Sequence, residues 1–91
     1  MAYRLVYSKN AAKEISKLDN LVKRKIKEAI ETKLLTDPLV NSLKLQDFEV
    51  NGARRLRVGN YRIIFYLDKK VIEILRVGHR REIYKGEKSY D

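Results

Sequence analysis

The hydrophobic period of the chain changes after residue 52, and this change constrains the fold more than any other feature of the sequence. Before it, apolar residues recur every three or four positions over long stretches; beyond it, they alternate with polar ones. Asn51-Gly52 is a turn signal at the boundary. The alternating runs, which Gly59-Asn60 and Asp68-Lys69-Lys70 separate as tight turns, span 54–58, 61–67 and 71–77. They predict three consecutive antiparallel strands.

The first half of the sequence predicts one strand and two helices. Residues 3–7 alternate as in a strand, and Ser8 follows as the N-cap of a helix that carries Ala11, Ala12, Ile15 and Leu18. Asp19-Asn20 interrupts this helix and begins a second one, which Asp37-Pro38 ends. One face of the second helix carries Val22, Ile26, Ala29, Ile30 and Leu34. Residues 39–52 are expected to form a loop, anchored by Leu43, Leu45 and Phe48.

This order of elements predicts an α+β fold, in which a strand and two helices precede a three-stranded antiparallel meander. The helices are expected to pack on one face of the sheet, because each amphipathic face must be buried against another element. With 91 residues, the chain is expected to form one domain over 1–91.

Composition favours a polyanionic partner and argues against metal chemistry. Lys plus Arg is 21 and Asp plus Glu is 12, so the formal net charge is +9. Cysteine is absent and histidine occurs once, so neither disulfides nor a thiolate or histidine metal site is expected, and no cofactor is predicted. No run approaches the ~18 apolar residues of a membrane span. The start of the chain lacks the apolar run of a signal peptide, so a cytoplasmic location without membrane contact is expected.

A two-residue turn at Gly59-Asn60 would fix which side chains share a sheet face. It places Arg57 opposite Arg62 and Arg55 opposite Ile64, so that Arg55, Arg57 and Arg62 lie together on one face. Leu56, Val58, Tyr61, Ile63 and Phe65 then form the core side. The same alternation of side chains along the last strand puts Ile72 and Ile74 in the core, and Glu73, Leu75 and Val77 on the arginine face.

Arginine and lysine are distributed differently along the chain. Seven of the nine arginines fall between positions 54 and 81, whereas most lysines lie in the helical half. The planar guanidinium matches phosphate geometry, so Arg55, Arg57 and Arg62 are interpreted as an anion-binding group, with Arg62 expected at an exposed site. Lys23-Arg24-Lys25 is interpreted instead as a solvated helix face.

Two further candidates follow the last strand. His79 can act as a general base or have a structural role beside Gly78. Tyr84 can cap the sheet edge, or it can lie near the arginines, whose positive charge would lower the pKa of its phenol and ease proton transfer. From the residues alone, the catalytic and the structural role remain open for both His79 and Tyr84.

Two segments resemble the toxins of the RelE/ParE superfamily, and the RelE branch in particular. They are Arg55-Leu56-Arg57-Val58-Gly59-Asn60-Tyr61-Arg62-Ile63-Ile64-Phe65-Tyr66 and Val77-Gly78-His79-Arg80-Arg81-Glu82-Ile83-Tyr84. The leading strand–helix–helix order agrees as well, so the resemblance covers essentially the whole chain. It implies a compact RelE-like, ribonuclease-like fold and a toxin of a type II toxin–antitoxin system.

The resemblance also implies an activity and its residues. RelE toxins are endoribonucleases (mRNA interferases) that cleave messenger RNA in the ribosomal A site without a metal, through attack of the substrate's own 2′-hydroxyl. Arg62, Arg80 and Tyr84 fall on the family's catalytic positions, and Arg55 and Arg57 on basic positions that are often lysine. The neighbouring residues expected to bind nucleic acid are Arg54, His79, Arg81 and Lys85. The expected partners are messenger RNA, ribosomal RNA and a cognate antitoxin, with which the chain would form a hetero-oligomer.

One departure from the family pattern affects the assignment of the base. Arginine stays protonated, so Arg55 and Arg57 cannot accept the proton, and that role passes to Tyr84, which is favoured, or to His79. Two other functions stay open: a ParE-like inhibitor of DNA gyrase with the same fold, and a non-enzymatic nucleic-acid-binding module that uses the same basic face.

Overall fold

The N-terminal strand and the two helices begin where the sequence predicts. The computed structural model describes residues 3–46, 48 and 50–83. It contains β1 (Arg4–Tyr7), α1 (Lys9–Ser16) and α2 (Asn20–Ala29). The Ser8 hydroxyl caps α1 by accepting a hydrogen bond from the Ala11 amide at 3.0 Å, and the Asp19 carboxylate caps α2 by accepting from the Val22 amide at 3.0 Å. Each cap satisfies an amide that the helix leaves unpaired, which fixes where each helix starts.

The second helix does not run unchanged to Pro38. It continues from α2 into a π-helical turn, η1 (Ile30–Leu34), in which the Leu35 amide donates to the Ile30 carbonyl at 2.9 Å. The hydroxyls of Thr32 and Thr36 donate to the carbonyls of Glu28 and Thr32, one turn earlier. Such side-chain bonds compete with the regular helical ladder. The widened turn leaves Leu34 fully buried.

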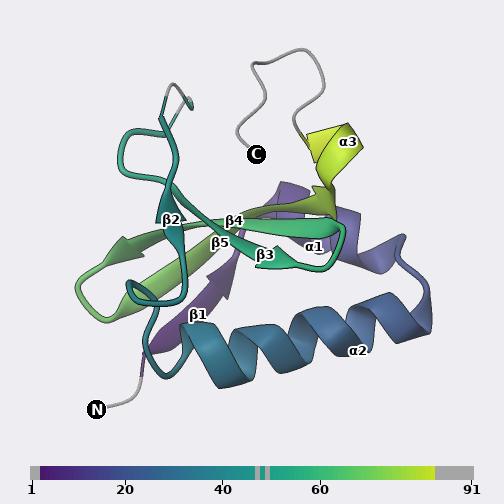
Figure 1. Cartoon of the computed structure of the whole chain (residues 1–91), viewed down its shortest axis with the longest axis horizontal. Coiled ribbons are helices and arrows are strands. Elements are labelled where there is room, and N and C mark those ends of the chain that lie inside the picture. The colour runs from purple at the N-terminus through teal and green to yellow at the C-terminus, as the bar shows by residue number, and fades with distance from the viewer. Residues whose placement is uncertain (1–2, 47, 49, 84–91) are drawn as a thin grey trace.

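The predicted meander is the centre of a larger sheet (Figure 1). Its strands are β3 (Arg54–Val58), β4 (Tyr61–Asp68) and β5 (Val71–His79), and α3 (Arg80–Ile83) follows. β1 pairs in parallel with β5, and a short strand, β2 (Leu43–Lys44), pairs with β3, giving the order β1-β5-β4-β3-β2. The α+β prediction is therefore confirmed: the predicted strand β1 and the unpredicted strand β2 form the two edges of the sheet.

The prediction of an uninterrupted loop over 39–52 is wrong, because Leu43 and Lys44 pair with Arg55 and Arg54. Leu43 does not anchor this segment, since it is 56% exposed. Leu45 does so at 4% exposure, and Phe48 packs against the same buried cluster. A two-residue strand is too short to produce a period of its own in the sequence, so nothing in the pattern marked it.

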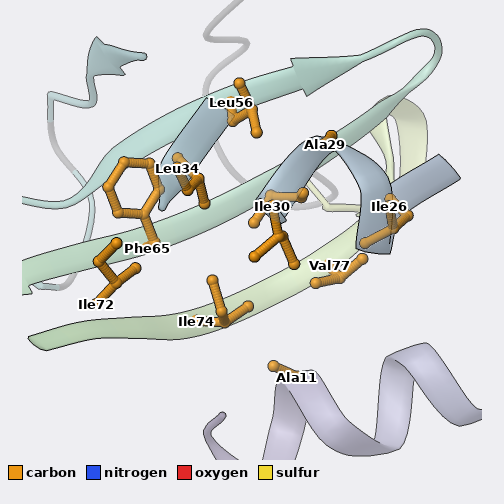
Figure 2. Close-up of a cluster of buried hydrophobic side chains, with 11 residues drawn as sticks. Ala11, Ile26, Ala29, Ile30, Leu34, Leu56, Phe65, Ile72, Ile74 and Val77 are labelled. Carbon is orange, nitrogen blue, oxygen red and sulfur yellow. The ribbon is translucent and has the colours of Figure 1, made fainter. Parts of the chain in front are cut away.

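The main core lies between the sheet and the helices. Figure 2 shows Ile26, Ala29, Ile30 and Leu34 pointing from α2 and η1 toward the sheet, with Ala11 approaching from α1. The sheet side of this cluster consists of Leu56, Ile63, Phe65, Ile72, Ile74 and Val77. The prediction is confirmed for the apolar face of the second helix except Val22, and for Ala11 of the first. Ile15, Leu18 and Val22 are half-buried at the margin of the core, whereas Ala12 is exposed.

The predicted position of Val77 is wrong, and a β-bulge is the reason. Phe65 pairs with Ile74 but Ile64 pairs with Arg76, so Leu75 has no partner in β4. The extra residue reverses the alternation beyond it. Leu75 therefore lies on the arginine face as predicted, whereas Val77 turns into the helix-side core at 1% exposure.

The face opposite α1 and α2 carries a second, smaller cluster. Its buried members are Leu45, Ala53, Ile64 and Ile83, and Phe48, Val50 and Leu75 pack against them. Residues from the 45–53 segment and α3 thus cover part of the face that carries the arginines. No helix within the described residues combines the length and the apolar character needed to cross a membrane.

Candidate functional site

The β3–β4 hairpin has the register that the two-residue turn predicts. Val58 pairs with Tyr61, Arg57 with Arg62, and Arg55 with Ile64. Gly59 occupies the first central position of the turn with a φ of 59°, a conformation that glycine adopts without the steric cost of a Cβ atom. Arg55, Arg57 and Arg62 therefore share one face of the sheet, as the sequence predicts.

The three arginines differ strongly in exposure. Arg57 is exposed, Arg55 is 8% exposed and Arg62 is 1% exposed. Nη1 of Arg62 donates hydrogen bonds to the Gly59 carbonyl at 3.0 Å and to the Tyr61 carbonyl at 2.9 Å. The expectation that Arg62 is an exposed group is therefore wrong. This face of the sheet is not open, because the second cluster, with Leu45, Ala53, Ile64 and Ile83 buried in it, covers part of it.

The start of α3 is attached to the same hairpin. The Arg80 amide donates to the Asn60 carbonyl at 2.8 Å, and Figure 1 shows α3 rising beside the β3–β4 turn. Arg80 and Arg81 are both exposed. Buried Ile83 fixes the other end of α3 to the second cluster. The exposed arginines of β3 and α3 thus belong to one end of the sheet. Arg57, Arg80 and Arg81 are referred to below as the arginine cluster.

His79 lies between the turn and α3. It pairs across the sheet with Tyr61, and the two rings meet edge to face with centroids 5.4 Å apart and planes at 77°. Its Nδ1 accepts a hydrogen bond from the Arg81 amide at 3.2 Å. Because a neutral imidazole carries one proton, this bond places the proton on Nε2 and gives His79 a role in capping α3.

Two other arginines in the basic half have well-defined structural contacts. Nε of Arg54 donates to the Ser42 hydroxyl at 2.7 Å, and Nη2 donates to the carbonyls of Leu39 and Ser42 at 3.2 and 3.0 Å. Arg76 forms an ion pair with Glu14 of α1, with Nη2 2.8 Å from Oε2. Neither pairing has a marker in the sequence, because the partners are 12 and 62 residues away.

Tyr84 and Lys85 lie outside the residues that the structure describes, so their roles stay predictions. Within the described ranges, no three His, Cys, Asp or Glu side chains gather in a group that could hold a metal ion. Arg55 lines a shallow pocket of about 330 Å³ next to β2, together with Leu43, Lys44, Leu45 and Gln46.

Sequence analysis missed a larger groove on the opposite side of the molecule. It has a volume of about 580 Å³ and lies between β1, α1 and α2. Its apolar lining includes Leu5, Ala12, Ile15 and Leu35, and its charged lining consists of Lys23, Lys27 and Glu31. Beside it, Val6 and Tyr7 of β1 are 43% and 42% exposed. Burial, and secondarily the negative charge of Glu31, raise the pKa of Tyr7 above its usual value.

Comparisons with known proteins agree on one family. The family described as "ParE toxin of type II toxin-antitoxin system, parDE" matches residues 5–84. Toxin RelE3 of Methanocaldococcus jannaschii is 32% identical over 84 residues, which is 89% of this chain and 94% of the relative.

Solved structures of toxin–antitoxin complexes have the same fold. A chain of the RelBE2 complex from Mycobacterium tuberculosis superposes with a TM-score of 0.78 at 27% identity, covering 88% of this chain and 100% of that one. A chain of the RelB–RelE complex from Methanococcus jannaschii gives a TM-score of 0.66 at 25% identity, with coverages of 87% and 94%. The family match spans most of the sequence, and the fold agrees with it. This chain therefore belongs to the RelE/ParE family of type II toxin–antitoxin toxins.

Proposed function

We propose that the protein is a ribosome-dependent endoribonuclease that cleaves messenger RNA in the ribosomal A site. The observation that carries this proposal is the arginine cluster, in which the hairpin and α3 present exposed Arg57, Arg80 and Arg81 at one end of the sheet. The relative named RelE3 supports the same branch of the family.

The proposed reaction requires charge stabilisation more than a protein nucleophile. The 2′-oxygen of the RNA attacks the adjacent phosphorus, the bond to the 5′-oxygen breaks, and the products are a 2′,3′-cyclic phosphate and a 5′-hydroxyl. Negative charge develops on the non-bridging oxygens, where guanidinium donors stabilise it. An exposed cluster without a deep cleft is sufficient if the ribosome itself orders the substrate.

One proton must leave the 2′-hydroxyl, and one must reach the leaving 5′-oxygen. We assign the first transfer to Tyr84, as the family resemblance implies, and solvent water supplies the second proton. His79 is the alternative, although its Nδ1 is occupied by the Arg81 amide. Its Nε2 would have to lose a proton before it could accept one, which makes the capping role the better account of this histidine.

Primer extension on translating ribosomes tests the proposal directly. Addition of the wild-type protein should create new 5′ ends within codons at the A site, and naked messenger RNA should stay intact. Arg80→Ala should remove these ends. DNA breaks with continuing translation would instead support a ParE-like gyrase inhibitor, which the matched family's description keeps as the second candidate.

We further propose that a separate antitoxin binds and inhibits this chain. Both solved relatives named above were determined as complexes of toxin with antitoxin. The net charge of +9 favours an acidic segment, which we expect to neutralise the arginine cluster. The groove beside β1 offers apolar area with Lys23 and Lys27 at its margin, which suits an amphipathic segment of the same partner.

Co-expression tests the antitoxin proposal. The complex should unfold at a higher temperature than the toxin alone, because a ligand that binds only the folded state stabilises it. Ala12→Arg should weaken the complex by filling the groove from an exposed position, whereas Lys13→Ala next to it should not. Full tolerance of the active wild-type chain by cells that lack any partner would contradict the proposal.

A further inference from the structure

We propose that Arg62 is a positioning residue, which holds the β3–β4 turn and thereby sets the place of Arg80 and Arg81. This inference rests on the proposed function for its catalytic consequence, but its structural part is independent of any activity. It assigns to a buried guanidinium a role different from direct contact with the scissile phosphate.

Two hydrogen bonds join the Arg62 guanidinium to the backbone of the turn. At 1% exposure, its side chain is among the most buried large groups of the protein. Nη1 donates to the carbonyls of Gly59 and Tyr61, at 3.0 and 2.9 Å. A guanidinium nitrogen of this kind carries two hydrogens, one for each carbonyl. A buried charge without hydrogen-bond partners is costly, so the folded protein retains both of these bonds. The two bonds in turn fix the orientation of the Gly59 and Tyr61 carbonyls.

The other side of the same turn supports α3. The carbonyl between the two that Arg62 binds is that of Asn60, and it accepts the Arg80 amide at 2.8 Å. His79, which precedes α3, lies edge to face against the ring of Tyr61 and caps the Arg81 amide. The carbonyls of Gly59 and Tyr61 therefore bind Arg62. The Asn60 carbonyl and the Tyr61 ring contact Arg80 and His79, at the start of α3.

In this arrangement the positions of exposed Arg80 and Arg81 depend on the contacts of buried Arg62. Arg80 and Arg81 lie in a helix of four residues, which is too short to be stable without tertiary contacts. Among the described residues, the contacts that hold it include the Asn60 carbonyl, the His79 cap and the burial of Ile83. Misplacement of a phosphate-binding group by a small distance lowers a rate strongly, so loss of the turn geometry should reduce cleavage even when both exposed arginines remain.

Hydrogen exchange of the Arg80 amide, followed by NMR, measures the structural part of the proposal. Arg62→Gln removes the charge and Nη1. Gly59→Ala disturbs the same turn without touching Arg62, because a Cβ there meets no atom within 4 Å and acts only through the positive φ. Both variants should speed exchange of this amide by about tenfold, beyond any change in global stability. Asn60→Ser, an exposed change in the same turn that keeps the backbone carbonyl, is the matched control and should leave exchange unchanged.

Cleavage on programmed ribosomes measures the catalytic part. Arg62→Gln and Gly59→Ala should each lower kcat more than KM, and the double variant should cost less than the sum of the two, because both act on one turn. A different outcome would overturn the proposal and make Arg62 a direct donor to the phosphate. In that outcome Arg62→Gln lowers the cleavage rate by about 10²–10³-fold while exchange of the Arg80 amide is unchanged and Gly59→Ala is fully active. If the wild type does not cleave, the proposed function fails, and the exchange measurement alone decides the role of Arg62. If Arg62→Gln does not fold, Arg62→Lys takes its place, because it keeps the buried charge but loses the planar fork; unchanged exchange of the Arg80 amide in this variant would overturn the proposal.

Discussion

The Glu14 carboxylate joins α1 to two successive residues of β5. Its Oε2 accepts hydrogen bonds from Nε and Nη2 of Arg76 at 3.0 and 2.8 Å, and its Oε1 accepts the Val77 amide at 2.9 Å. β1 ends its pairing with β5 at Ile74, so the carboxylate satisfies a backbone amide that the edge strand does not reach. One helix side chain thus continues the sheet edge just beyond the bulge at Leu75.

Loss of this carboxylate should lower stability. Glu14→Gln keeps the shape and one acceptor but removes the charge, and the pair is about a third exposed. We expect a loss of about 1–2 kcal/mol in the free energy of unfolding, which is smaller than for a fully buried pair because solvent screens it. Urea denaturation measures the change. Glu28→Gln, on the exposed side of α2, is the control, and an equal loss in both variants would mean that the contact with β5 contributes nothing.

Arg80→Ala should lower cleavage by about 10²–10³-fold while leaving the fold intact. Its side chain is exposed, and substitutions at such positions usually change stability within ~0.5 kcal/mol. Single-turnover cleavage and thermal unfolding, measured on the same preparation, separate the two effects. Arg24→Ala on the exposed face of α2 is the control for bulk charge. Equal losses from Arg24 and Arg80 would show that attraction of RNA, rather than a defined site, is being measured.

Tyr84→Phe should slow the chemical step by roughly 10²–10⁴-fold without affecting folding, because only the hydroxyl is removed. His79→Gln should have a smaller effect, since a glutamine oxygen can still accept the Arg81 amide. The pH dependence of single-turnover cleavage distinguishes a proton-transfer role from packing. An active Tyr84→Phe beside an inactive His79→Gln would exchange the two assignments.

Arg54→Ala should loosen the segment around Leu39 and Ser42 more than it affects the sheet. Three hydrogen bonds from this guanidinium end in that segment, where Ser42 also donates to the Pro38 carbonyl at 2.5 Å. We expect faster proteolysis near residues 39–42 and a loss of about 1–3 kcal/mol. Arg54→Lys should recover only part of this, because one ammonium lacks the fork that reaches both Leu39 and Ser42. Unchanged protection in Arg54→Ala would contradict the structural role.

Tyr7 should make stability fall at high pH. Burial and Glu31 raise the pKa of its phenol in the folded state, so folding favours the protonated form. This contribution is present below about pH 10 and is lost as the pH rises through the raised value. The free energy of unfolding of the wild type should therefore fall relative to Tyr7→Phe between about pH 9 and about pH 11. A constant difference across that range would show that Tyr7 titrates alike in both states.

Local rules account for what the sequence predicted correctly. Ser8 and Asp19 cap helices through bonds to residues three positions on, and a two-residue turn fixes the pairing of Arg57 with Arg62. The family motifs supplied the identity, since no local rule distinguishes a toxin from another α+β domain.

The errors come from contacts that are distant along the chain. The bulge at Leu75 depends on how β4 meets β5, and it moved Val77 to the other face. Burial of Arg62 depends on what else covers its face, which alternation cannot reveal. The groove beside β1 exists only because the strand and both helices come together there.

The position of β5 inside the sheet also determines when a newly made chain can fold. β5 lies between β1 and β4, and the Ser8 hydroxyl donates to the Leu75 carbonyl across 67 residues of sequence. A nascent chain that has emerged only as far as residue 70 lacks β5, which pairs with β1 and supplies Ile72, Ile74 and Val77 to the core under the helices. Such a chain should show no cooperative unfolding transition when prepared as a fragment. Folding of the domain is therefore expected only after β5, which ends at His79, has been made and has left the ribosome.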